Sequence, residues 1–203
     1  MKKGFTLVEM LVVIGILAVL VAASLGAYSK ITANAEKKRC DSLVRDVAAA
    51  LTKLNDDNGG LWPSAIGRLG ETGGELDERA ALPLAPYLGL TKNSDGTSLS
   101  GANQFGLVTP WAQDAIKRSG SGASLSTRVP GGGTIQDHRL YCAVDLGDDG
   151  IIKSANVGGE SVSVRARAIV WCCGKDGKLE AYSKGLKRDD VYSWTKGQAT
   201  AVE

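Results

Sequence analysis

The sequence has few of the residues on which enzymes and metal proteins base their chemistry. Its 203 residues include a single histidine, His138, and four cysteines that form no C-x-x-C pair. A zinc centre is therefore disfavoured. No serine lies in the glycine-flanked turn that presents a catalytic nucleophile, so an enzyme is not the favoured interpretation.

Net charge and aromatic content are also low. The chain has 24 basic and 22 acidic side chains, a formal charge of +2, and 5% aromatic residues. This balance does not indicate a nucleic-acid-binding surface, and no nucleic acid partner is expected. The 26 glycines favour a distal region of loops and short strands over a helical bundle. The length fits one domain of ordinary size plus an extended element.

Hydrophobic residues, by contrast, are concentrated in one long run near the N-terminus. From Phe5 to Tyr28 there are 24 residues with one charged side chain, Glu9. A helix of this length crosses a bilayer core of about 30 Å, so residues 5–28 are predicted to span a membrane. A buried helix of a soluble protein is disfavoured, because such helices are usually shorter and polar on one face. A cleaved secretory signal is also disfavoured, because the small residue Gly4 precedes the run.

The start of this run resembles the processing motif of type IV pilins and of type II secretion pseudopilins. The matching residues are Lys2-Lys3-Gly4-Phe5-Thr6-Leu7-Val8-Glu9. The motif combines a residue order, a short basic leader and a lone acid at a fixed offset. The resemblance implies that a prepilin peptidase removes the leader, residues 1–4, by cutting between Gly4 and Phe5. It also implies that the new amine of Phe5 is methylated and that the leader lies in the cytoplasm.

The position of Glu9 is consistent with this resemblance on physical grounds. An ionised carboxylate in lipid costs several kcal/mol unless a partner neutralises it. Cleavage creates an ammonium on Phe5, and pairing it with Glu9 of a neighbouring subunit removes two exposed charges. Such a pair favours a defined axial stagger between subunits. The alternative is that Glu9 reaches the lipid headgroups, since it lies only a turn from the start of the run.

The helical pattern continues beyond the apolar run. Apolar residues recur at spacings of three and four, as an amphipathic helix with one buried face requires: Cys40, Leu43, Val44, Val47, Leu51 and Leu54. We therefore predict one helix from about Thr6 to Asn55, with an amphipathic continuation over residues 29–58. The glycines after Asn58 end it.

Residues 59–203 are predicted to form a globular α+β region outside the cytoplasm. Glycines, prolines and scattered helical pieces extend to about Gly133, and strands are predicted over 139–144, 161–167 and 168–172. The Trp62-Pro63 pair and the Thr109-Pro110-Trp111 stretch resemble turns of major pseudopilins, and loops anchored by a buried Trp explain them equally well. The expected fold is α+β, pilin-like, with the long helix packed on a small C-terminal antiparallel sheet.

The C-terminal segment resembles the calcium-binding loop that closes major pseudopilins. The candidate ligands are Asp176, Asp189 and Asp190, whose carboxylates suit a hard cation. Lys184, Lys187 and Arg188 lie within the same loop and weaken the assignment. The alternative is that these acids are solvated turn residues.

The four cysteines permit disulfides if the domain is exported. Three full pairings are possible among Cys40, Cys142, Cys172 and Cys173. Adjacent cysteines seldom pair with each other. We therefore expect a bridge from Cys142 to either Cys172 or Cys173 across neighbouring strands.

The expected function is that of a structural protein. The resemblance implies a pseudopilin of type II secretion, anchored by one span in the inner membrane and assembled into a homo-oligomeric periplasmic filament. Its partners would be the prepilin peptidase, the inner-membrane assembly platform and membrane lipid. The alternative within the family is a pilin of a surface filament for adhesion, motility or DNA uptake. The alternative outside it is a membrane-anchored periplasmic enzyme.

Overall fold

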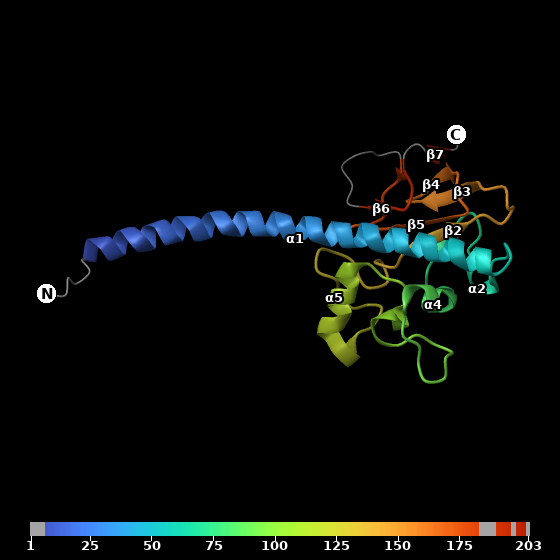
Figure 1. The fold of residues 1–203 in the computed structure, drawn as a ribbon, viewed down its shortest axis with the longest axis horizontal. Helices are drawn as coiled ribbons and strands as arrows, with labels where there is room; N and C mark the ends of the chain where they lie inside the picture. The colour runs from blue at the N-terminus through green and yellow to red at the C-terminus, as the bar shows by residue number, and fades with distance from the viewer. Residues whose placement is uncertain (1–6, 183–189, 196–197, 202–203) are drawn as a thin grey trace. The chain divides into compact units, whose positions relative to one another are not determined.

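The computed structural model describes residues 7–182, 190–195 and 198–201 (Figure 1). The chain divides into two units, residues 1–38 and residues 39–203. Helix α1 (Leu7–Asp57) has 51 residues and contributes to both units. It confirms the single long helix predicted from the sequence, and Gly15 does not interrupt it.

Helix α1 ends where the Asn-Gly-Gly sequence predicts. The backbone amide of Gly60 donates to the carbonyl of Asn55 at 2.9 Å, and the side-chain amide of Asn58 donates to the carbonyl of Leu54 at 2.6 Å. Gly59 and Gly60 have φ angles of +66° and +86°. Left-handed glycines at this place are the usual way to terminate a helix.

In the first unit, the part of α1 from residue 7 to residue 23 is exposed along its whole length. None of the helices in the described part of the chain has both the length and the apolar character that crossing a bilayer requires. The membrane-spanning role of residues 5–28 stays a prediction.

The second unit contains two antiparallel sheets within the described residues. The first has the order β1-β2-β5-β6, with bounds Gly74–Glu75, Tyr141–Val144, Ala168–Cys172 and Val191–Tyr192. The second has the order β3-β4-β7, with bounds Ile152–Val157, Glu160–Val164 and Ala199–Ala201.

The predicted strands are present, but the sheet is not single. Strands β2 and β5 lie within the predicted ranges, and β4 ends at Val164, earlier than expected. The second sheet exists because β3 pairs with β4 through a tight turn at Gly158 and Gly159, which have φ angles of +61° and +85°. Two such glycines suit the hairpin turn whose twist matches antiparallel strands. Strand β3, with the polar sequence IKSANV, carries too weak a hydrophobic pattern to be predicted.

The second half of α1 packs on the first sheet, as its amphipathic pattern predicts. The helix contributes Val44, Leu51 and other buried side chains to one hydrophobic core. The same core contains Val144 of β2, Val170 of β5 and Val191 of β6. Burial of these apolar surfaces, at roughly 25 cal/mol per Å², holds the helix to the sheet. The α+β architecture of this unit is therefore confirmed.

Apart from β1, the regular elements described between α1 and β2 are short helices, as the prolines of this region indicate. The α-helices are α2 (Ser64–Gly67), α3 (Glu78–Ala81), α4 (Ala85–Leu88) and α5 (Pro110–Ser119). Three 3-10 turns lie among them: η1 (Leu82–Leu84), η2 (Gly101–Phe105) and η3 (Gly120–Gly122). Pro110 occupies the first position of α5, where its fixed φ favours a helix and no backbone donor is lost.

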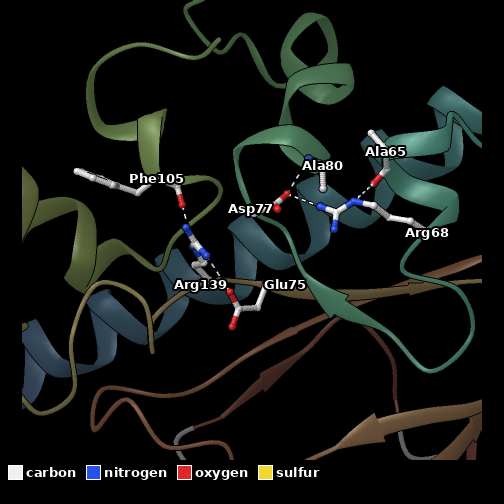
Figure 2. A network of polar contacts seen from close by, with 7 residues as sticks. All are labelled: Ala65, Arg68, Glu75, Asp77, Ala80, Phe105 and Arg139. Atoms are coloured by element: carbon white, nitrogen blue, oxygen red, sulfur yellow. Dashed lines mark hydrogen bonds and ion pairs between the residues drawn. The ribbon is translucent and has the colours of Figure 1, made fainter. Parts of the chain in front are cut away.

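One carboxylate organises the start of this helical region. Asp77 caps α3 by accepting a hydrogen bond from the backbone amide of Ala80 at 2.9 Å. The same oxygen atom of Asp77 accepts from the guanidinium of Arg68 at 2.6 Å (Figure 2). Arg68 also donates to the carbonyl of Ala65. These contacts connect α2 to α3 next to strand β1.

Candidate functional site

The most exposed apolar surface in the described chain is the N-terminal part of α1, residues 7–23, which we call the apolar segment. The relative exposure of Leu7 is 81%, that of Val19 is 69% and that of Ile14 is 63%. Soluble monomers seldom expose a continuous apolar surface of this extent, so it marks a surface that another molecule covers.

Glu9 is the acidic residue in the first turn of α1. Its carboxylate lies near the positive end of the helix macrodipole, which favours a negative charge at this position. Gly4 and Phe5 lie outside the described residues, so the predicted pair between Glu9 and the amine of Phe5 is not tested by the structure. The geometry places the lone acid within the apolar segment, as the sequence predicts.

In the C-terminal loop, Asp190 is 7% exposed and its carboxylate accepts three hydrogen bonds. The donors are the backbone amide of Gly174 at 3.0 Å, the backbone amide of Glu180 at 3.1 Å and the hydroxyl of Tyr192 at 3.3 Å. These hydrogen bonds to the carboxylate of Asp190 connect the two sides of the loop.

The described part of the loop does not by itself form a calcium site. Asp176 accepts from the backbone amide of Lys178 at 2.9 Å, as in an ordinary Asx turn. No group of three His, Cys, Asp or Glu residues in the described ranges is placed to hold a metal ion. Asp189 lies outside the described residues, so calcium binding stays a prediction.

All four cysteines are buried, and none is bonded to another in the structure. The strand register places Cys142 opposite Val170 on β5, so the expected bridge from Cys142 to Cys172 or Cys173 stays a prediction. Cys173 donates instead to the carbonyl of Asp137 at 3.0 Å. The sulfur that faces another sulfur is that of Cys40, which lies 2.8 Å from the sulfur of Cys172.

Residues 1–25 match the family described as the prokaryotic N-terminal methylation motif. The chain is 35% identical over 63 residues to a ComG operon protein 3 homolog of Bacillus licheniformis. It is 38% identical over 63 residues both to competence protein ComGC of Bacillus subtilis and to a type IV major pilin protein PilE of Neisseria gonorrhoeae. By this motif and these relatives, the N-terminal part of the chain is similar to proteins of the type IV pilin-like family.

The similarity to these pilin-like relatives covers part of each chain. The matches span 31% of this chain and, respectively, 65%, 64% and 37% of the three relatives. No solved structure is significantly similar to the chain. The matched methylation motif contains Gly4, Phe5 and Glu9, which are part of the pilin-like processing motif in the sequence.

Two buried polar residues of this domain, Asp145 and His138, hold loops in place by hydrogen bonds that the sequence did not predict. Asp145 is 3% exposed, and its carboxylate accepts from the backbone amides of Gly147 at 2.9 Å and Gly150 at 2.7 Å. Its carbonyl accepts from the indole nitrogen of Trp62 at 2.7 Å. The spacing Asp-x-Gly-x-x-Gly is the sequence signal that indicates this turn, although it does not predict the contact with Trp62.

His138 is the second such residue, and it is fully buried. One ring nitrogen lies 2.9 Å from the hydroxyl of Thr109, and the other lies 3.0 Å from the carbonyl of Gly132. These contacts hold the start of α5 and the glycine-rich loop at residues 131–133 together. The imidazole is thus a buried structural group, and nothing in the sequence near it indicates this.

Proposed function

We propose that this pilin-like chain is the structural subunit of a type IV pilus-like filament, and specifically a pseudopilin of type II protein secretion. The observation that carries the proposal is the exposed apolar segment with its acidic residue Glu9, which lies within the matched methylation motif. A chain with this much exposed apolar surface needs lipid or neighbouring copies to cover it. In the proposed sequence of events, inner-membrane lipid covers residues 5–28 first, and other subunits cover them after assembly.

The proposed processing step creates the group that Glu9 requires. A prepilin peptidase hydrolyses the bond between Gly4 and Phe5, releases residues 1–4 and leaves an ammonium on Phe5, which is then methylated. In the low dielectric among packed apolar helices, this cation attracts Glu9 of a neighbouring subunit strongly. The pair forms only at one axial offset between subunits, so it selects the stagger of the filament.

The proposed location follows from the same segment. Before assembly the subunit is a single-pass protein of the inner membrane, with its C-terminal domain in the periplasm. Its partners are the prepilin peptidase, an assembly platform in the inner membrane, membrane lipid and other copies of the chain. Calcium at Asp176, Asp189 and Asp190 is part of the proposal only through the resemblance of the C-terminal loop, because Asp190 already has three hydrogen-bond donors.

A surface pilus is the second candidate function. Relatives of this chain are named as a type IV major pilin protein and a competence protein, and these names favour a filament for adhesion, motility or DNA uptake. The two functions are separated by a deletion strain. Loss of an exported enzyme from the medium supports the secretion role, whereas loss of surface filaments in electron micrographs supports the pilus role.

The N-terminal sequence and mass of the mature protein from its own cells test the proposal most directly. We expect the chain to begin with an N-methylated Phe5 and to lack residues 1–4. Gly4→Val should leave an unprocessed chain that is heavier by the leader, whereas Gly15→Val, in the helix beyond the cleavage site, should be processed normally. A mature protein that begins at Met1 contradicts the proposal.

A further inference from the structure

The sulfur atoms of Cys40 and Cys172 lie 2.8 Å apart, and both side chains are fully buried. This separation is only about 0.8 Å longer than a disulfide bond of roughly 2.0 Å. Cys40 is the first residue of α1 that the structure describes as buried, at the start of the second unit. Cys172 is the last residue of β5, all of whose side chains are buried. The pair therefore connects the beginning of the packed part of the helix to an inner strand of the first sheet.

The other two thiols have different surroundings. Cys142 lies opposite Val170 in the strand register and has no other sulfur across from it. Cys173 follows Cys172 directly, and neighbouring residues of an extended chain point to opposite sides. Its sulfur donates to the carbonyl of Asp137 and lies 3.7 Å from a ring nitrogen of His138. Among these four thiols, Cys40 and Cys172 are the pair whose sulfurs the structure places close enough to bond.

We propose that Cys40 and Cys172 form a structural disulfide that fastens helix α1 to the sheet of the exported domain. The inference rests on the proposed function in one respect, because an exported domain meets an oxidising compartment. The oxidant is an external disulfide, of a thiol oxidase protein or of glutathione. Its sulfur–sulfur bond breaks, the Cys40–Cys172 bond forms, and two protons and two electrons pass to the oxidant, which leaves as two thiols.

The burial of the pair dictates when the bond forms. Thiol–disulfide exchange requires a thiolate and physical access to the sulfur. Burial raises the pKa of the Cys172 thiol well above its ordinary value, and the contact with Cys40 raises it further. The folded domain therefore presents neither a thiolate nor an accessible sulfur. Oxidation takes place while the helix is still docking, and the finished bond is afterwards protected from reductants.

The consequence for the subunit is mechanical as well as thermodynamic. The two cysteines are 132 positions apart in the chain, so the bond closes a very long loop in the unfolded state. Long closed loops give large stabilisation in the chain-entropy description. In the proposed filament, a force on the N-terminal helix would pass to β5 through this covalent bond. The apolar contacts of Val44 and Val47 with the core then do not have to resist it alone.

Peptide mapping of the full chain from its own cells tests the proposal. The protein is denatured in an excess of alkylating reagent, so that free thiols are blocked, and is digested with trypsin without reductant. Cleavage after Arg39, Arg45, Arg167 and Lys175 yields peptides 40–45 and 168–175, while Cys142 lies in peptide 140–153. We expect peptide 40–45 joined to 168–175, with fragmentation assigning the bond to Cys172. A link from 140–153 to 168–175, or alkylation of both Cys40 and Cys172, overturns the proposal.

Refolding of the reduced full chain in a glutathione redox buffer separates the two reasons for such a failure. If the pair bonds in the buffer but is found as thiols in the cell, the geometry is right and the proposed export is wrong. If the pair stays reduced in the buffer as well, the inference from the geometry is wrong while the proposed function is unaffected.

Matched alanine variants provide a second readout. Reductant present during unfolding should lower the Tm of the unsubstituted chain by roughly 10 °C. Cys40→Ala and Cys172→Ala should each abolish this shift. Cys142→Ala removes an equally buried sulfur that faces no other sulfur, so it should lower the Tm in both conditions and keep the shift. A shift that persists in Cys40→Ala contradicts the proposed bond.

Discussion

The guanidinium of Arg139, two residues before β2, lies 2.8 Å from the carboxylate of Glu75 in strand β1 (Figure 2). Arg139 also donates to the carbonyl of Phe105 at 2.9 Å. Its side chain is only 13% exposed. An ion pair with such limited access to water is costly to break on one side, because the partner keeps its charge.

Arg139→Met should therefore lower the free energy of unfolding by about 1 to 3 kcal/mol, since the variant leaves Glu75 and the carbonyl of Phe105 without their donor. Arg167→Met is the matched control. Arg167 pairs with Asp56 at 3.0 Å, but its side chain is 46% exposed, and pairs of this kind contribute about 0 to 1 kcal/mol. Urea unfolding of both variants measures the difference. Equal losses would show that the burial of Arg139 is unimportant.

Gly106→Ala should destabilise the domain through the backbone. Gly106 has a φ of +93°, and an added Cβ would lie against the carbonyl of Leu76 and 2.8 Å from the Cα of Asp77. Strain of this kind costs about 1 to 3 kcal/mol before the steric overlap is added. Gly122→Ala, where the added atom meets nothing within 4 Å, should change stability little. Urea midpoints that fall equally in both variants contradict this account.

The stability of the domain should fall at alkaline pH in a way that depends on Tyr141. Burial, together with the nearby charge of Glu75, raises the pKa of Tyr141 from its ordinary value of 10.0 to about 12. A phenol that ionises more readily in the unfolded chain stabilises that chain. The contribution of Tyr141 is therefore complete below pH 10 and is lost progressively between about pH 10 and pH 12. Burial also raises the pKa of the Cys142 thiol, so ionisation of this thiol in the unfolded chain lowers stability from about pH 9.

Tyr141→Phe isolates the part due to the phenol. Both proteins keep the thiols, so the difference between their urea midpoints across pH 10 to 12 reports Tyr141 alone. We expect a shallower decline in the variant. Tyr28→Phe, at a residue that is 69% exposed, serves as the control and should follow the unsubstituted protein. If the urea midpoint of Tyr141→Phe falls between pH 10 and 12 as steeply as that of the unsubstituted protein, the phenol is not desolvated as the structure indicates.

Asp190→Asn tests how the C-terminal loop is held. The amide nitrogen of Asn cannot accept a hydrogen bond, so a backbone donor at Gly174 or Glu180 loses its partner at a cost of about 1 to 3 kcal/mol. Asp176→Asn affects one local turn and should cost less.

Melting temperatures of the unsubstituted protein and of both variants, measured with added calcium and with magnesium as the control, then test whether the loop binds calcium. A specific rise that both substitutions remove supports a calcium site, and no rise at saturating calcium refutes it.

Glu9→Ala should be inserted and processed normally but should assemble poorly, because the amine of Phe5 then lacks its partner in an apolar surrounding. Glu9→Gln should behave in the same way, whereas Glu9→Asp keeps the charge and should recover part of the assembly. Filament yield and the mass of the processed chain are the measurements. If Glu9→Ala forms filaments as well as the unsubstituted protein does, the proposed pair between Glu9 and the amine of Phe5 is wrong.

The local sequence decided the helix, its two surfaces and the processing motif. The apolar run with Glu9 and the amphipathic pattern from Cys40 to Leu54 both depend on residues within a few turns of each other, and the helix observed over Leu7–Asp57 follows from them. The strand segments of β2 and β5 were found for the same reason, since β-branched and aromatic residues act locally.

Which residues distant in the sequence come into contact was decided only by the tertiary structure. The separation of Cys40 and Cys172 by 132 positions gives no local signal, and the choice of Cys172 over Cys142 depends on how the helix docks on the sheet. The burial of His138 and the three donors around Asp190 are of the same kind. Short-range periodicity determines which face of a segment is buried, whereas the side chains that meet there depend on strand register and packing, which arise when the whole domain folds.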